Sequence, residues 1–226
     1  MILRSVLSAG QFSNLPQPTV QYLGSYTQTT STTISTGTPS ATRSIVAIIS
    51  GYYGTSTAAI SNLRINNTLC SRVGSSQTNI YTGFVAIGAL ALPTGTTTSL
   101  SFSVLYDEVN IAVFSIKGKI PTNFSAATNT GTPTGTVFSH TLTTTSPVNK
   151  SLIFTGISSY AGGRLDATSS LPNTLIIPVG GATYVLGSAY TSVSTSVNPY
   201  TITWTAPVGQ SWGALGHTVS SLAIGF

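Results

Sequence analysis

The chain has 226 residues, of which 41% are hydrophobic and only 5% are charged, and its formal net charge is +5. Serine and threonine together supply 71 residues. This composition excludes coiled coils and helical bundles, in which roughly half of the residues are Ala, Glu, Lys, Leu or Arg. A disulfide scaffold is excluded because Cys70 is the only cysteine, and the hydrophobic fraction argues against intrinsic disorder.

Residues 1–42 are rich in Ser, Thr and Pro and carry few large apolar side chains after Leu23. We interpret them as an extended N-terminal arm that becomes ordered against a partner or a neighbouring subunit, or else as a partly disordered lead-in. The first ten residues lack the apolar core of about 7–15 residues that a secretory signal needs. The longest apolar run, residues 84–92, is shorter than the roughly 20 residues of a spanning helix. We therefore expect neither a signal peptide nor membrane insertion.

From residue 43 onward, apolar residues alternate with hydroxyl-bearing ones in short segments that are separated by Gly, Pro and Asn. Alternation with a period of two indicates strands with one core face and one hydroxylated face. These segments predict an antiparallel, jelly-roll-like β-sandwich of about 10–11 strands. The predicted strands are residues 44–50, 63–70, 80–92, 99–104, 109–116, 136–142, 151–158, 174–179, 183–192, 200–205 and 218–224.

The strand pattern of residues 43–120 recurs weakly in residues 136–226, with a low-complexity linker predicted over 123–135. Each half is expected to supply one Greek-key half of a single two-sheet sandwich that spans residues 43–226. Two small domains are the alternative. We favour the single sandwich because five strands make a thin independent core.

The residues that ordinarily carry catalysis are scarce. The only acids are Asp107, Glu108 and Asp166, and the two neighbours are expected to diverge in a hairpin turn, so no pair of catalytic carboxylates is expected. His140 and His217 are predicted to be structural. Zinc, calcium, P-loop and dinucleotide signatures are not found in the sequence. We therefore expect a non-enzymatic protein without a metal or cofactor.

The eight Lys and Arg residues are scattered, and only Lys117 and Lys119 lie close together. Nucleic-acid binding normally needs a basic stripe or arm, so we expect no nucleic-acid partner and interpret these charges as aids to solubility. Cys70 is expected to be a small buried hydrophobe.

Aromatic residues are the better candidates for contacts with a ligand or a partner. Trp212 lies in a glycine-flanked segment, where its ring is either a stacking platform for a sugar or a plug at one end of the sandwich. We add Tyr160, Tyr52 and Tyr53 as further candidate ligand or interface residues.

A soluble domain normally has about 25% charged residues, and a surface with few charges promotes association. Much of this surface is therefore expected to be covered by neighbouring subunits. A family resemblance lies in the order of segments along the chain. A polar arm comes first, and four segments follow it: Arg43-Ser44-Ile45-Val46-Ala47-Ile48-Ile49, Asn62-Leu63-Arg64-Ile65-Asn66-Asn67, residues 92–102 and residues 110–118.

This order resembles that of small β-sandwich structural proteins of tailed bacteriophage virions. The resemblance implies a capsid- or tail-attached decoration, spike or fibre-associated subunit, which is assembled in the host cytoplasm and binds identical subunits and other virion proteins. It transfers no catalytic residue. The alternative is a lectin- or adhesin-like module that recognises a host-surface glycan through loop aromatics such as Trp212 and Tyr160.

Overall fold

The computed structural model describes residues 18–27, 29–53, 60–75, 82–131, 137–143, 151–160, 168–171, 173–176, 184–192, 199–205 and 217–226. These residues form seventeen strands, and the strands pair antiparallel throughout. Within them, no helix has the length and apolar character that a membrane crossing requires. The all-β, sandwich-type fold predicted from the sequence is therefore confirmed.

The first half of the chain forms two sheets. Sheet A has the strand order β1-β9-β3-β7-β6 and sheet B the order β2-β8-β4-β5. The strands of sheet A are β1 (Thr19–Thr27), β3 (Ser44–Tyr53), β6 (Ser71–Ser75), β7 (Thr82–Ala91) and β9 (Glu108–Lys117). The strands of sheet B are β2 (Ser31–Ser35), β4 (Ser61–Ile65), β5 (Thr68–Leu69) and β8 (Thr97–Ser103).

The second half repeats this arrangement. Sheet C has the order β10-β17-β12-β15-β14 and sheet D the order β11-β16-β13. The strands of sheet C are β10 (Asn123–Gly131), β12 (Ser151–Tyr160), β14 (Asn173–Ile176), β15 (Tyr184–Ser192) and β17 (His217–Gly225). The strands of sheet D are β11 (Val137–Leu142), β13 (Thr168–Ser169) and β16 (Tyr200–Thr205).

The pairing register shows how closely the two halves correspond. Ser44 pairs with Ile116 in sheet A, and Leu152 pairs with Ile224 in sheet C, so the central strands of the second half follow their counterparts by 108 residues (44 to 152, 116 to 224). In the first half, the order β1-β9-β3-β7 in one sheet and β2-β8-β4-β5 in the other is that of a jelly roll. The second half repeats this strand order.

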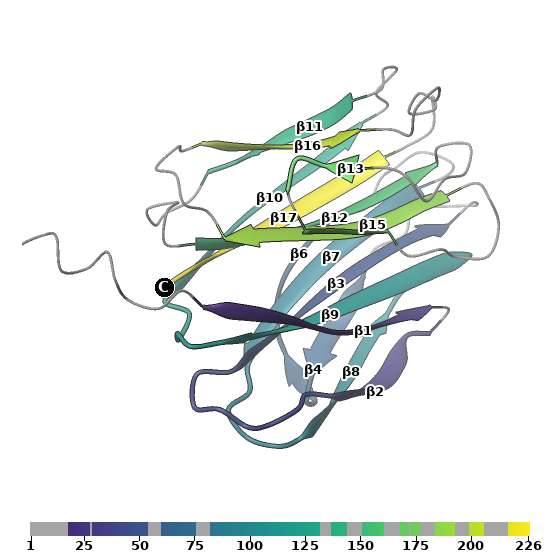
Figure 1. The fold of residues 1–226 in the computed structure, drawn as a ribbon. Helices are drawn as coiled ribbons and strands as arrows, with labels where there is room; N and C mark the ends of the chain where they lie inside the picture. Colours follow the sequence, from purple (N-terminus) through teal and green to yellow (C-terminus); the bar gives the residue numbers. More distant parts are fainter. Residues whose placement is uncertain are drawn as a thin grey trace, which may run out of the picture.

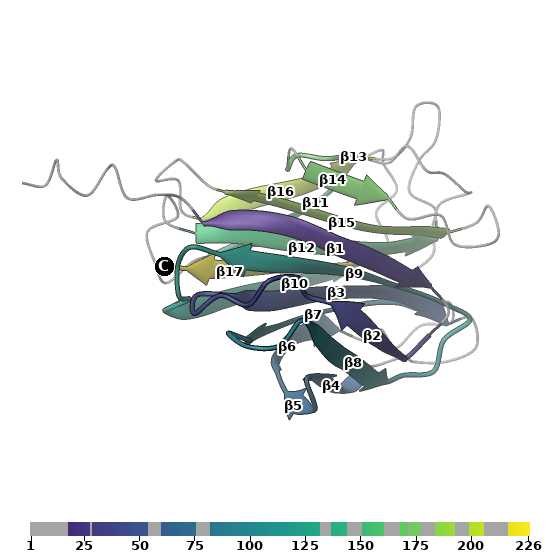
Figure 2. The ribbon, with the colours of Figure 1, turned by 60° about the horizontal axis from the view of Figure 1, so that its bottom comes forward.

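The four sheets stack in the order B, A, C, D, as Figure 1 shows from bottom to top and Figure 2 from a second direction. Three apolar cores fill the spaces between them. One lies between sheets A and B, one between sheets C and D, and the third between the two inner sheets A and C. The molecule therefore has four layers, rather than the two that we expected from the sequence.

Layer position explains the hydrophobic pattern of each strand. Inner strands are covered on both faces, so β3 and β9 are buried at almost every position and have nearly continuous apolar sequences. Outer strands have one face in contact with solvent, so β8 and β11 alternate between exposed and buried positions. The strict alternation of Ser99–Val104 and Tyr200–Thr205 marks the two outer sheets.

The two inner sheets pack face to face, with β3 against β12 and β7 against both β12 and β17. Ile48 and Gly156 occupy equivalent positions in the repeat and meet at this interface. A Cβ atom at position 156 would lie only 2.7 Å from Cγ2 of Ile48. Glycine in one half therefore accommodates the larger side chain of the other half.

Two segments that we did not expect to be strands form three strands. Residues 19–35, which we placed in an arm, form β1 and β2, and these strands pair with β9 and β8. Residues 123–131, which we interpreted as a linker, form β10 beside β17. All three strands lie at sheet edges. Edge strands are partly exposed to solvent, so they can have a polar composition, and this composition made them resemble an arm and a linker in the sequence. Residues 1–17 lie outside the described part of the chain.

Arg43 is buried, with 1% of its surface exposed, and is not one of the solubilising charges that we expected. Its guanidinium donates hydrogen bonds to six backbone carbonyl oxygens at 2.6–3.2 Å. The acceptors lie in the β2–β3 loop (Thr36, Gly37, Thr38) and after β7 (Leu92, Thr94, Gly95). One side chain thus joins two loops at one end of the first jelly roll, and burial lowers its pKa.

Candidate functional site

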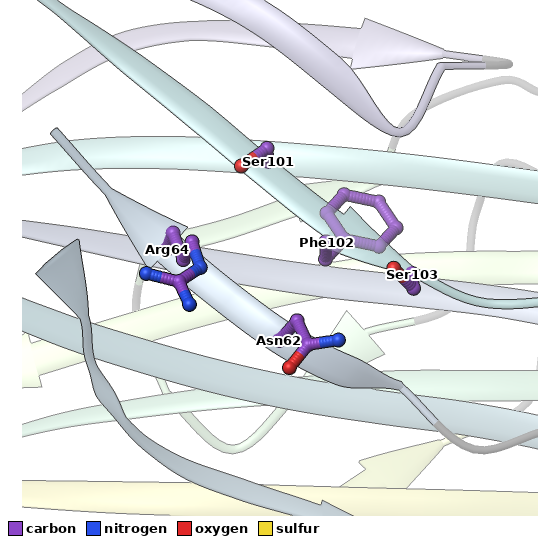
Figure 3. Close-up of a pocket in the computed structure, with 5 residues that line it drawn as sticks. All are labelled: Asn62, Arg64, Ser101, Phe102 and Ser103. Carbon is purple, nitrogen blue, oxygen red and sulfur yellow. The ribbon is translucent and has the colours of Figure 1, made fainter. Parts of the chain in front are cut away.

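A polar hollow of about 300 Å³ opens on the outer face of sheet B, between the neighbouring strands β4 and β8. Figure 3 shows the side chains that line it. Asn62 and Arg64 come from β4, and Ser101, Phe102 and Ser103 from β8. Asn62, Arg64 and Ser103 are exposed, whereas Phe102 is only 6% exposed and belongs to the core beneath.

A bulge in β4 shapes this hollow. Ser61 pairs with Ser103 and Arg64 with Ser101, so the register shifts between the two pairs. Asn62 lies within the shift and has a left-handed φ of 53°, which asparagine tolerates better than most residues. Bulges bend a strand and redirect its side chains. Asn62 and Arg64 are two residues apart and lie on one face of β4, as in any strand, and they line the hollow together with Ser101 and Ser103 of β8 (Figure 3).

The guanidinium of Arg64 is held by the adjacent hairpin. Its Nη1 donates a 2.9 Å hydrogen bond to the carbonyl oxygen of Asn67. Asn66 and Asn67 form the two-residue turn between β4 and β5, with φ values of 53° and 59°, and a tight hairpin of this kind requires positive φ at both positions. The sequence predicts a single strand over residues 63–70, and the structure corrects this, because the turn at these asparagines divides the segment into β4 and β5. The turn therefore also provides an anchor for Arg64.

The aromatic residues proposed from the sequence do not line this hollow. Tyr52 is buried in β3, with 2% of its surface exposed, and Tyr53 is partly buried against the core between sheets A and B. Burial leaves the ring of Tyr52 no free face for stacking on a sugar. Tyr160 ends β12, but its side chain lies outside the described part of the chain, as does all of Trp212.

His140 forms a buried hydrogen bond across two sheets. Its Nε2 lies 2.7 Å from Oγ of Ser221, which joins β11 of sheet D to β17 of sheet C. A serine beside a histidine is also the nucleophile–base pair of many hydrolases. Here His140 is 6% exposed and Ser221 is fully buried. Burial lowers the pKa of His140 to about 4, which makes it a poor general base near neutral pH. We therefore assign this pair a structural role, as predicted for His140.

The other reactive residues also have structural surroundings. Cys70 is buried, its Sγ donates to the carbonyl of Leu63 at 3.2 Å, and desolvation raises the thiol pKa to about 11. Glu108 begins β9, and its pKa is raised by burial and, to a smaller extent, by the neighbouring Asp107. Among the described residues, no group of three His, Cys, Asp or Glu side chains is placed to hold a metal ion. Asp166 and the side chain of His217 lie outside those residues.

The residues that line the hollow were not selected from the sequence. Serine and asparagine are too common in this chain to stand out, and the bulge depends on pairing between strands that are distant in the sequence. One signal was available in Leu63-Arg64-Ile65, where a charge replaces the hydroxyl-bearing residue on the outward side of an alternating strand. We had grouped Arg64 with the scattered solubilising charges.

Comparison with known proteins gave no family model that matches this chain, no similar curated protein and no similar solved structure. The fold and the hollow therefore define the chain only as an all-β protein of stacked jelly-roll sheets.

Proposed function

We propose that the chain is a non-enzymatic structural subunit of a bacteriophage virion, which attaches to the capsid or tail and acts by assembling with identical subunits and other virion proteins. The observation that carries this proposal is the character of the two outer faces of the stack. The bacteriophage assignment itself rests on the sequence resemblance described above.

Both outer faces consist mainly of small hydroxyl-bearing side chains. On sheet D, Ser139 and Thr203 face each other across β11 and β16, with their hydroxyl oxygens 2.9 Å apart. On sheet B, Ser31 and Thr33 of β2 pair with Ser101 and Ser99 of β8. Flat faces with short, uncharged side chains lose little conformational entropy when they are covered, which favours burial against a neighbouring subunit.

Charge is scarce over the rest of the molecule as well. The chain has only eight basic and three acidic residues, and one of the basic residues, Arg43, is buried. A monomer with so few surface charges tends to associate. Exposed apolar side chains on β10, on β11 and before β10 add to this tendency, with Phe124, Val137 and Ile120 exposed by 45%, 48% and 63%.

The first test is the mass of the full-length protein, measured by light scattering on a sizing column over a range of concentrations. We expect a defined oligomer. Ser139→Lys places a charge on the outer face of sheet D and should dissociate an oligomer that buries this face. Ala41→Lys adds the same charge at an exposed position of the β2–β3 loop, outside the sheets, and serves as the matched control.

Circular dichroism should show that both variants are folded, because both positions are exposed. Mass spectrometry of purified phage particles from the source of the chain then tests the virion assignment. A protein that stays monomeric at every concentration and is absent from such particles would overturn the proposal.

A further inference from the structure

The hollow between β4 and β8 has an uncompensated positive charge. Arg64 carries five N–H groups, of which one is used by the hydrogen bond to Asn67. Within the described residues, no carboxylate lies within salt-bridge distance of this guanidinium. Arginine binds a carboxylate through two parallel hydrogen bonds. The group that best complements Arg64 is therefore a carboxylate supplied by a ligand.

The groups around Arg64 are suited to hydroxyls. The side chains of Asn62, Ser101 and Ser103 make no hydrogen bond to other described residues. The amide offers two donors and an acceptor, and each serine offers a donor and two acceptor lone pairs. Each hydroxyl of a sugar ring can both donate and accept a hydrogen bond, so one residue of a glycan can satisfy several of these groups together.

The position of the hollow in sheet B disfavours an acidic peptide. Peptides commonly bind sheets by adding a strand to an unpaired edge. Sheet B has the order β2-β8-β4-β5, so β4 and β8 are both interior strands whose backbone groups are already paired. The hollow offers side chains only. A free phosphate is also a poor match, because Arg64 is the single cation among the lining residues.

We propose that this hollow binds a carboxylate-bearing sugar within a glycan, with Arg64 holding the carboxylate and the neighbouring amide and serine hydroxyls holding the sugar hydroxyls. The bulge at Asn62 and the hairpin turn at Asn67 position these groups before the ligand arrives. The site lies within one chain, but Ser101 belongs to the outer face of sheet B that the assembly proposal uses, so glycan binding requires that subunit contacts leave the hollow uncovered.

The test is isothermal titration of the full-length protein with a short oligogalacturonate, with the uncharged galactose oligomer of the same length and with oligoglutamate. We expect measurable binding of the oligogalacturonate alone. Arg64→Gln should weaken that binding about tenfold or more, because it removes charge-assisted hydrogen bonds. Lys119→Gln removes the same charge from the β9–β10 connection and should leave binding unchanged.

Asn62→Gly provides a second variant that keeps the left-handed backbone, which glycine adopts freely, and removes only the amide. We expect a several-fold loss of affinity with an unchanged circular dichroism spectrum. Absence of binding by the acidic oligomer would overturn the proposal, as would equal binding of oligoglutamate or of the uncharged oligomer. Equal losses in Arg64→Gln and Lys119→Gln would also overturn it, because they would show attraction to overall charge.

Discussion

Arg43 shows how a charged residue can become part of a core that contains almost no other charge. Its six acceptors are all backbone carbonyls of two loops. The guanidinium therefore supplies the hydrogen-bond donors that a neighbouring strand supplies to carbonyls within the sheets. Because the five N–H groups of arginine face six oxygens, at least one hydrogen is shared. The shorter lysine, with its single nitrogen, cannot reach both loops.

We expect Arg43→Met to lower the free energy of unfolding by at least about 3 kcal/mol, because it leaves several buried carbonyls without donors. Urea unfolding followed by circular dichroism measures this loss. Lys119→Met is the matched control at a partly exposed position, and it should change stability by less than about 0.5 kcal/mol, as surface substitutions away from buried networks usually do. Equal effects of the two substitutions would show that the loops do not need the guanidinium.

His140 makes stability depend on pH in a defined direction. Burial lowers its pKa in the folded state to about 4, whereas an unfolded histidine titrates near pH 6.5. Between these values the unfolded chain binds the extra proton, so the stabilisation is complete above about pH 6.5 and is lost as the pH falls towards 4. We expect the free energy of unfolding to be about 2 kcal/mol lower at pH 5 than at pH 7.

His140→Gln keeps a polar side chain near Ser221 but cannot titrate, so it provides the control for this prediction. The raised pKa of Glu108 acts in the opposite direction, and it is common to both proteins. The difference between their pH profiles therefore isolates the histidine. If the two profiles run parallel between pH 7 and pH 5, the assignment of the pH dependence to His140 is wrong.

At the scale of elements, the contact between β3 and β12 depends on one small residue. Gly156 leaves room for Ile48 and Val85, whose methyl groups would lie 2.7 and 2.8 Å from an added Cβ. We expect Gly156→Ala to destabilise the protein by about 1–3 kcal/mol through overpacking. In the double variant with Ile48→Ala, part of this cost should be recovered, and the double-mutant cycle of unfolding free energies measures the coupling. Additive effects would contradict direct packing.

The N-terminal strands change how the proposed arm must be tested. Deletion of residues 1–42 would remove β1 and β2, and with them the fully buried Ile34, and would leave β9 and β8 as unpaired edges. We expect that truncated protein to be insoluble or unfolded. Deletion of residues 1–17 keeps every described strand.

The shorter deletion should give an unchanged circular dichroism spectrum and melting temperature. Light scattering of this truncated protein then shows whether the first seventeen residues contribute to assembly. A melting temperature well below that of the full chain would show that these residues also support the fold.

At the scale of the whole molecule, the core between sheets A and C links the two halves. Its buried members come from both halves and include Phe114, Phe154 and Leu222. Tyr22, Phe114 and Tyr190 continue it as a series of ring contacts with centroids 5.2–5.6 Å apart. Separation of the halves would expose this core to water, which is strongly unfavourable. The hydroxyl of Thr218 also donates across the interface to the carbonyl of Gly83 at 2.8 Å.

We therefore expect the protein to unfold in one cooperative transition. In scanning calorimetry, the calorimetric and van't Hoff enthalpies should agree. Leu222→Ala removes an apolar side chain from the shared core and should lower the single melting temperature without splitting the transition. Two resolved transitions in the wild-type protein would show that the halves are energetically independent.

The candidate site was less predictable than the fold, for a physical reason. Binding sites on a sheet are made of residues from neighbouring strands, and here Arg64 and Ser101 are adjacent only because β4 pairs with β8 across 37 positions of sequence (64 to 101). The bulge that exposes Asn62 is a property of this pairing. Tyr52 illustrates the opposite error, since an aromatic residue near a strand end resembles a ligand contact in the sequence, whereas in the structure it is buried.

The sequence by itself determined the class of fold, because alternation of apolar and hydroxyl-bearing residues is a local property that strands reveal one at a time. It also indicated the repeat. Only the tertiary structure decided that the sheets stack in four layers. Continuous apolar runs such as Ile45–Ile49 were compatible with any buried strand, and what covers the second face of a strand depends on residues more than a hundred positions away.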